Sequence, residues 1–255
     1  MHIPAATALG PAVLTALAVL CAAADSFPAD GKRTPPETVI LLHGLSRTPR
    51  SLSKLERALS RNGYRVHNMA YPANSRAIEM LAEYLAGGIG PPCREPGQRV
   101  HFVTHSMGGI VLRYYLNTHS CPNLGRVVML GPPNGGSELI DFMRKVPVLR
   151  THLGPSRGQL GTTPSDLPAR LGPAWYELGI IAGNRSLIPV SSLMIPGPGD
   201  GMVSVERTKL SGMKDFLVVP HSHTFIMRSR EVIAQTIAFL KEGAFDRSGS
   251  SRGSP

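Results

Sequence analysis

Short apolar runs alternate along the chain with segments in which apolar residues recur every three or four positions. The apolar runs, in which β-branched residues are frequent, lie at residues 38–42, 64–67, 100–103, 127–130, 192–195 and 216–219. The amphipathic segments between them lie at residues 51–61, 75–85, 107–117, 137–144 and 231–240. The first pattern predicts buried strands and the second predicts helices. Strands that alternate with helices are typical of an α/β fold with a mostly parallel central sheet covered on both faces.

The first 24 residues differ from the rest of the chain. From Pro4 to Ala24 no side chain is charged, and the stretch ends in three alanines. An apolar segment of this length that ends in small residues predicts a signal peptide cleaved after Ala24, and hence a periplasmic or secreted protein. The segment is too short for a comfortable transmembrane helix, which needs about 20 apolar residues.

The remaining chain is long enough for one core, so we expect a single domain over residues 25–242. A segment rich in proline and glycine, residues 147–176, interrupts the alternation and is the expected cap or lid. Residues 243–255 are mostly small and polar, which predicts a disordered tail.

One serine lies where a buried strand is predicted to turn into a helix. Residues 104–109 read Thr-His-Ser-Met-Gly-Gly, and a serine at such a turn is typical of a nucleophile elbow. The N–H groups of the following helix favour negative charge near its hydroxyl. Gly108 is small, as a crowded turn requires, whereas Thr104 stands where the usual motif has glycine. Ser106 is therefore the candidate covalent nucleophile, and a helix N-cap is the alternative interpretation.

A serine nucleophile needs a base, and the base needs an orienting acid. Both are expected after Ser106 in the order acid, then histidine. Asp200 lies in a Gly-Pro-Gly-Asp-Gly turn after the predicted strand 192–195, at the sheet edge where ligands bind. An ordinary turn aspartate is the alternative, and Asp215, which precedes the last strand, is expected at the opposite edge. His223, in the loop after that strand, is the preferred base, and His221 is the alternative.

Two backbone N–H groups complete the candidate site. One belongs to Met107, the residue after the nucleophile, and the other to Leu45, which follows the first predicted strand. In this architecture such N–H groups form the oxyanion hole. Gly44 precedes Leu45 and allows the backbone to approach a substrate closely.

The number and positions of the cysteines indicate whether a disulfide can form. Removal of the leader would take away Cys21 and leave Cys93 and Cys121, an even number in an exported chain. The strand and helix between them return the chain to the same edge of the sheet, which predicts a disulfide, with two free thiols as the alternative.

The charge and the spacing of residues limit the kinds of partner that the protein is expected to bind. The net charge is +10, which favours transient contact with an anionic membrane surface. The basic residues are scattered without interleaved aromatics, which argues against nucleic-acid binding. No histidine pair or cysteine cluster has metal-ligand spacing, so neither a metal nor a cofactor is predicted. Nothing in the pattern indicates an oligomer, so we expect a monomer.

In these motifs the chain resembles the α/β-hydrolase superfamily, and in particular exported bacterial triacylglycerol lipases and carboxylesterases. The resemblance rests on residues 41–45, 103–109, 131–137, 199–203 and 223–225, in that order. It implies hydrolysis of carboxylic esters through an acyl-enzyme without a cofactor. An acyltransferase, thioesterase or amidase with the same catalytic residues is one alternative, and a non-catalytic protein that binds a lipid or a partner is another, because fold does not fix function.

Overall fold

A parallel sheet of six strands forms the centre of the computed structural model, which describes residues 36–187 and 194–248 together with His2. The strand order is β2-β1-β3-β4-β5-β6, and every neighbouring pair is parallel. The strands are β1 (Thr38–Leu42), β2 (Arg65–Met69), β3 (Val100–His105), β4 (Leu124–Leu130), β5 (Leu178–Gly183) and β6 (Asp215–Val219). The predicted α/β architecture is confirmed. The predicted signal peptide, apart from His2, lies outside the described residues.

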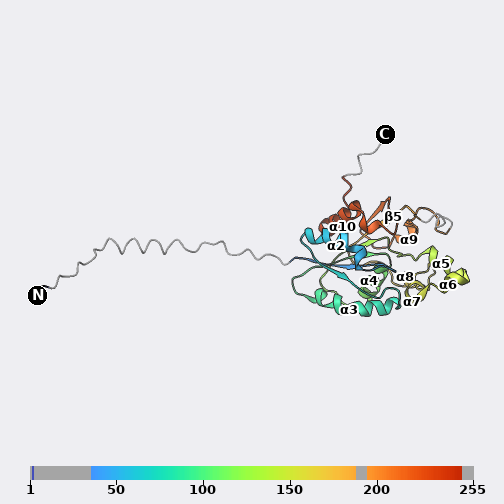
Figure 1. The fold of residues 1–255 in the computed structure, drawn as a ribbon, viewed down its shortest axis with the longest axis horizontal. Helices are drawn as coiled ribbons and strands as arrows, with labels where there is room; N and C mark the ends of the chain where they lie inside the picture. Colours follow the sequence, from blue (N-terminus) through green and yellow to red (C-terminus); the bar gives the residue numbers. More distant parts are fainter. Residues whose placement is uncertain (1, 3–35, 188–193, 249–255) are drawn as a thin grey trace, which may run out of the picture. The chain divides into compact units, whose positions relative to one another are not determined.

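Helices cover both faces of the sheet, which explains why its central strands are apolar along their whole length. In β1, Ile40 and Leu42 point into the core beneath α3 (Ile78–Arg94) and α4 (Met107–Thr118). Val39 and Leu41 point into a second core beneath α2 (Ser53–Arg61) and α10 (Arg230–Glu242). Figure 1 shows α2 and α10 together on one side of the sheet and α3 on the other. Successive strand residues therefore fill two different cores.

The helices vary greatly in length. The longer ones are α2 (Ser53–Arg61), α3 (Ile78–Arg94), α4 (Met107–Thr118), α5 (Glu138–Lys145) and α10 (Arg230–Glu242). The short ones are η1 (Pro49–Leu52), α6 (Pro147–Arg150), α7 (Gly154–Arg157), α8 (Leu167–Arg170), α9 (Val205–Thr208) and η3 (Ile226–Arg228). None of the helices that the structure describes is long and apolar enough to span a bilayer.

The fifth strand is not where the hydropathy pattern places it. Half of the predicted strand at 192–195 lies outside the described residues, and the other half, Met194 and Ile195, lies in a turn and a bend. The sheet instead uses β5, whose two glycines weaken its resemblance to a strand. Gly179 has a packing reason, because a Cβ there would come within 2.7 Å of the Phe239 ring of α10.

The packed chain also extends beyond the expected boundary at residue 242. Gly243 ends α10 in the left-handed conformation, and Phe245 is buried against Phe239 with the ring centroids 5.1 Å apart. Arg247 then forms an ion pair with Asp215 at the start of β6, 2.5 Å away. These contacts fix the chain as far as residue 248, so a tail that begins at 243 is corrected to a later boundary. Asp215 lies at the amino ends of the strands, as predicted.

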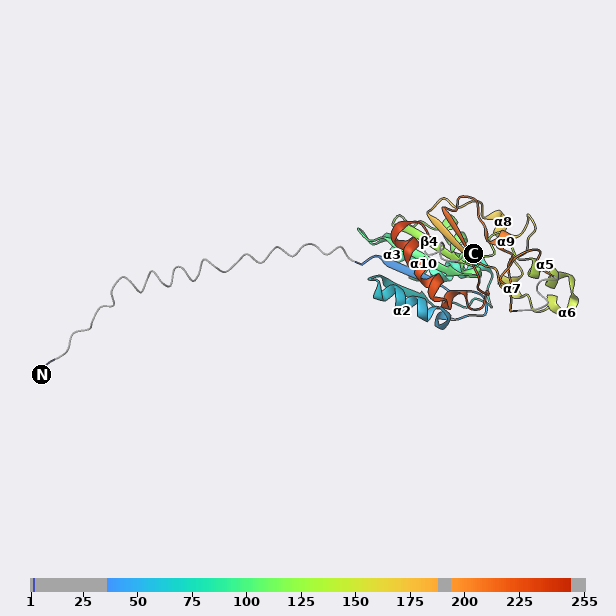
Figure 2. The ribbon, with the colours of Figure 1, turned by 90° about the horizontal axis from the view of Figure 1, so that it is seen from above.

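The segment expected to form a cap contains α6, α7 and α8, each of four residues. Figures 1 and 2 both place α6 and α7 with α5 at one end of the domain. Arg144 of α5 forms hydrogen bonds of 2.5 and 2.9 Å with Asp166, and the Gln159 side chain accepts the Ile78 N–H at 2.7 Å. The segment is thus tied to the body of the domain at several points.

A buried arginine adds a further tie that the sequence patterns do not predict. Arg113 lies in the middle of α4 and is only 3% exposed. Its guanidinium donates to the backbone oxygens of Asn134, Pro168 and Gly172 at 2.8 to 3.1 Å, and burial lowers its pKa to about 10. One side chain therefore joins α4, the loop after β4 and the segment around α8.

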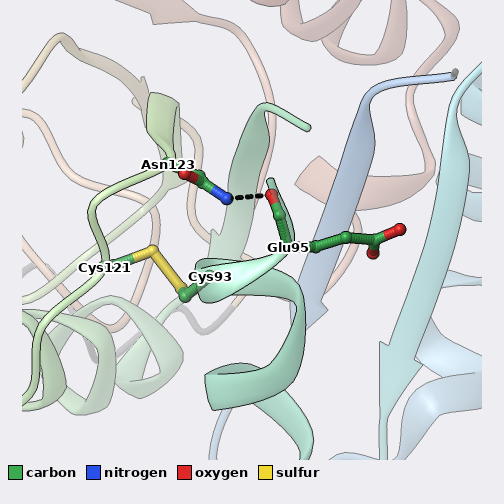
Figure 3. Close-up of a disulfide and its surroundings, with 4 residues drawn as sticks. All are labelled: Cys93, Glu95, Cys121 and Asn123. Carbon is green, nitrogen blue, oxygen red and sulfur yellow. Dashed lines mark hydrogen bonds between the residues drawn. A yellow bond between two sulfur atoms is a disulfide. The ribbon is translucent and has the colours of Figure 1, made fainter. Parts of the chain in front are cut away.

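The predicted disulfide is present. Cys93, in the last turn of α3, is bonded to Cys121, which follows α4, with their Cα atoms 4.7 Å apart. Figure 3 shows this bond beside a hydrogen bond from the Asn123 amide to the Glu95 carbonyl. The carboxy-terminal ends of α3 and α4 are thus joined covalently.

Replacing both cysteines tests the contribution of this bond. The chain-entropy model gives about 3 to 4 kcal/mol for the loop that it closes, so C93S/C121S should unfold at a clearly lower urea concentration than the wild type. Reductant should lower the wild-type midpoint toward that of the variant and leave the variant unchanged. Equal midpoints for oxidised wild type and variant would contradict this assignment.

Gly108 and Gly87 form a matched pair for testing the packing of α4. A Cβ at Gly108 would lie 2.6 Å from the Leu42 carbonyl oxygen, whereas one at Gly87, in α3, would meet nothing within 4 Å. Gly108→Ala should therefore lower the free energy of unfolding by about 1 to 3 kcal/mol, and Gly87→Ala should raise it by about 0.5 to 1 kcal/mol. Thermal and urea unfolding measure both, and a Gly108→Ala variant as stable as Gly87→Ala would refute the close contact.

Candidate active site

Ser106 occupies the sharp turn between β3 and α4. Its φ of 55° and ψ of −129° are rare for a residue with a side chain, and such strain persists only where the surroundings impose it. The Ser106 N–H donates to the Leu130 carbonyl at 2.9 Å. A Cβ at Gly44 would lie 2.9 Å from the Ser106 Cβ. The loop after β1 therefore runs directly against the serine, which only a glycine permits.

Thr104 is accommodated in this turn by the second glycine of the motif. The threonine is fully buried, and its hydroxyl oxygen has no hydrogen-bond partner among the described residues. A Cβ at Gly109 would come within 3.3 Å of that oxygen. Gly109 therefore leaves the space that the threonine side chain takes up, and the elbow forms despite the departure from the usual motif.

Asp200, His223 and Ser106 lie in one chain of hydrogen bonds. The His223 Nε2 atom is 2.8 Å from the Ser106 Oγ, and His223 Nδ1 is 2.7 Å from Asp200 Oδ2. Asp200 is 2% exposed and His223 is 8% exposed. The three residues that the motifs single out are thus brought together from loops after β3, β5 and β6.

The position of the Asp200 carboxylate is fixed by the backbone around it. Oδ1 accepts the N–H groups of Met202 and Val203 at 3.0 and 2.9 Å, which leaves Oδ2 for the histidine. The backbone N–H of His223 also donates to the backbone carbonyl of Asp200 at 3.0 Å. Gly131, at the end of β4, has a φ of 54°, and a Cβ there would lie 2.9 Å from Oδ2. Gly131 belongs to the motif at residues 131–137, but the sequence does not indicate its contact with the carboxylate.

The alternative base, His221, is engaged elsewhere. Its Nε2 lies 2.8 Å from the Ser229 Oγ and 3.3 Å from a carboxylate oxygen of Glu231, at the start of α10. No hydrogen bond joins it to Ser106. The geometry therefore selects His223 from the two candidates in this loop.

His105 contacts the backbone of His223, and the sequence patterns do not indicate this contact. It is 1% exposed, and its Nε2 lies 3.0 Å from the His223 carbonyl oxygen, so this nitrogen must carry the proton and donate. Its Nδ1 has no partner among the described residues. Burial, reinforced by the nearby His223, holds the pKa of His105 well below its ordinary value of 6.5. His105 is therefore neutral.

The two candidate oxyanion donors belong to the residue after the serine and to the loop after β1. Met107 is the first residue of α4, and Leu45 belongs to the loop that approaches Ser106. Among the described residues, neither backbone N–H has an acceptor. The loop itself is held in place, because Ser46, with a φ of 53°, donates its N–H to the Asn74 side chain at 2.9 Å.

A largely apolar cavity of about 480 Å³ opens beside Ser106 and His223. Its apolar walls are Leu45, Pro133, Leu139, Ile140, Met143, Leu160, Met202 and Val203. The α5 helix supplies three of these apolar residues, Leu139, Ile140 and Met143, and the 147–176 segment supplies Leu160. Within residues 36–187 and 194–248, no group of three or more His, Cys, Asp or Glu side chains is placed to hold a metal ion.

Solved structures with this fold include several hydrolases. The mature lipase BlEst2 from Bacillus licheniformis superimposes with a TM-score of 0.65 at 19% identity, over 85% of this chain and 95% of that one. Lipase B from Aspergillus fumigatus gives 0.61 at 16%, over 82% and 53%. A metagenomic carboxyl esterase gives 0.52 at 16%, over 76% and 66%. At these identities the likeness concerns the fold alone.

A family model supplies the more specific comparison. The model described as the alpha/beta hydrolase family matches residues 39–232. The match begins in β1 and ends in α10, and it includes the elbow, the Asp200 turn and the His223 loop. Together with the parallel sheet and the placement of these loops, it shows that the chain belongs to the alpha/beta hydrolase family.

Proposed function

We propose that this protein is a serine hydrolase that cleaves carboxylic esters through an acyl-enzyme. The observation that carries the proposal is the continuous hydrogen-bonded chain from Asp200 through His223 to Ser106, which ends at the mouth of an apolar cavity. A non-catalytic binding protein would have no need for a serine held in a rare backbone conformation against a histidine.

His223 acts first as a base and then as an acid. Its Nε2 takes the proton from the Ser106 Oγ while that oxygen attacks the ester carbonyl carbon. The same nitrogen then gives the proton to the leaving alcohol, and the acyl group stays on Ser106. Water repeats the two proton transfers, releases the carboxylic acid and restores the serine. Asp200 accepts the His223 Nδ1–H throughout, which keeps Nε2 free to accept and stabilises the imidazolium.

The oxyanion of each tetrahedral intermediate lies between the N–H groups of Leu45 and Met107. Such donors stabilise the transition state because they are already oriented when the charge develops, and loss of one typically costs about 3 to 4 kcal/mol. The Asn74 contact that fixes Ser46 also holds the Leu45 N–H in place.

His105 contributes by staying neutral. A second imidazolium beside His223 would oppose the positive charge that forms there during each proton transfer. The Nε2–H of His105 donates to the His223 carbonyl and so restrains the backbone of the base. We regard His105 as a positioning residue, because it acts through His223 and does not touch the serine hydroxyl.

Export agrees with the structure. A disulfide between Cys93 and Cys121 is typical of proteins that fold in an oxidising compartment. We propose that residues 1–24 are a signal peptide and that the mature enzyme acts in the periplasm or outside the cell.

Replacement of the three proposed residues tests the reaction. On 4-nitrophenyl butyrate, Ser106→Ala and His223→Gln should each lower kcat by about 10⁴-fold or more, and Asp200→Asn by about 10⁴-fold. Ser60→Ala, at an exposed position of α2, and His221→Gln are the matched controls and should retain activity. An active Ser106→Ala enzyme, or equal losses for His221→Gln and His223→Gln, would refute the assignment.

The neutral His105 also predicts a pH dependence of stability. In the unfolded chain its pKa returns to about 6.5, so below that pH the unfolded state binds a proton that the folded state does not. The free energy of unfolding should therefore fall as the pH is lowered from 6.5, by at most about 1.4 kcal/mol per pH unit from His105. Burial lowers the pKa values of His43 and His101 as well, which adds to the same trend.

Urea unfolding at pH 7.5, 6.5 and 5.5 measures this dependence. His105→Gln, whose amide can still donate to the His223 carbonyl, should show a shallower loss of stability on acidification than the wild type. His152→Gln, at an exposed position, is the matched control and should follow the wild type. Identical pH profiles for His105→Gln and the wild type would contradict the proton linkage.

A further inference from the structure

Two arginines stand out in the cavity beside Ser106. Arg47 and Arg157 both line it and both are partly buried, whereas among the described residues no aspartate or glutamate side chain lines it. The rest of the wall is apolar or neutral apart from the histidines of the site. A cavity that only had to hold an apolar acyl chain would gain nothing from two permanent cations.

Both arginines lie next to Ser46 in the lining of the cavity. Arg157 donates from Nη1 to the His152 carbonyl at 2.8 Å and from Nη2 toward the Ser46 Oγ at 3.4 Å. Arg47 follows Ser46 directly, and its N–H donates to the Gly44 carbonyl at 3.3 Å. Because Asn74 binds both the N–H and the hydroxyl of Ser46, this part of the lining is anchored beside the proposed oxyanion donor Leu45.

Neither arginine has a carboxylate of its own. Among the described residues, no Asp or Glu oxygen lies within 4.0 Å of Arg47 or Arg157. Two other partly buried arginines do have such partners, Arg144 with Asp166 and Arg126 with Glu177, whereas the buried Arg113 is bound by backbone oxygens instead. Withdrawing a cation from water without a counter-charge is unfavourable. The pair is therefore arranged for an anion that comes from outside the chain.

We propose that the substrate is an anionic ester, in which an apolar acyl chain fills the cavity while a phosphate or carboxylate group binds Arg47 and Arg157. This inference rests on the proposed ester hydrolysis at Ser106. Guanidinium groups suit this ligand because their planar N–H donors match the oxygens of phosphate and carboxylate in pairs. A neutral ester would leave both arginines without an anionic partner, so we expect the site to favour the anionic ester.

Pairs of substrates that differ only in the anionic group test the proposal. One pair is 1-hexanoylglycerol 3-phosphate, which carries its charge on the alcohol part, and the neutral 1-hexanoylglycerol. The other pair is 4-nitrophenyl hydrogen glutarate, which carries its charge on the acyl part, and the neutral 4-nitrophenyl butyrate. The readout is the ratio of kcat/KM for the anionic ester to kcat/KM for its neutral partner. In the wild type we expect this ratio to exceed about ten for at least one pair.

Charge-removing variants assign the effect to these side chains. Arg47→Gln and Arg157→Gln should each lower the ratio by about tenfold, since each removes one charge-assisted contact. Arg150→Gln, at an exposed position of α6 outside the cavity, removes the same net charge and should leave the ratio at the wild-type value. This control separates local binding from general attraction by a basic surface, which salt screens over about 8 to 10 Å.

Each outcome is decisive. A high ratio for the glycerol pair that depends on both arginines supports a phosphate on the alcohol part, and the same result for the glutarate pair supports a carboxylate on the acyl part. A wild-type ratio near one for both pairs, or a ratio that neither arginine variant changes, overturns the inference. If 4-nitrophenyl butyrate is still cleaved by the wild type and not by Ser106→Ala, the hydrolase itself stands; if no ester is cleaved, both fail together.

Discussion

The sharp turn at Ser106 is the constraint on which the site depends. The serine can leave β3 in a rare backbone conformation only because Gly44 lets the loop after β1 approach Ser106 closely and Gly108 lets the first turn of α4 approach the end of β1. The same close approach brings the loop that carries Leu45, one of the two proposed oxyanion donors, against Ser106, and Met107, the other, follows the serine directly. One local geometry therefore exposes the proposed nucleophile and orients the donors that would stabilise its product.

Parallel strand topology brings the other parts to that turn. Every strand of the sheet points the same way, so the loops after β1, β3, β5 and β6 open at one edge. Asp200 and His223 come from two of these loops and are joined by one backbone hydrogen bond, from the His223 N–H to the Asp200 carbonyl. The cap segment, tied down by Arg113 and by the Arg144–Asp166 pair, supplies part of the wall of the cavity above them. The packing of the domain thus positions the loops and the cavity wall, as the polar contacts position the residues of the site.

Much of this arrangement follows from the sequence because its signals are local. The elbow motif, the glycine-flanked Asp200 and the His223 loop each combine a residue type with the end of an apolar run, and order along the chain relates them. The disulfide followed from the return path of one strand and one helix. What the patterns miss depends on contacts between distant segments. The β5 strand is hard to predict because it contains Gly179, which makes room for Phe239. The chain after residue 242 packs against the domain because Phe245 contacts α10 and Arg247 forms an ion pair with β6. Arg113 lies in no motif, and although His105 and Gly131 lie within motifs, only the fold shows what these three residues contact.

The most direct test of the account is covalent labelling of the mature protein with a fluorophosphonate, followed by intact-mass measurement and peptide mapping. The phosphonate mimics the tetrahedral intermediate and reacts only with an activated serine. The account predicts one adduct per chain, located on Ser106, with labelling much slower in His223→Gln and unchanged in His221→Gln. Absence of an adduct, or an adduct on another serine, would contradict the central claim that Asp200, His223 and Ser106 act as one catalytic unit.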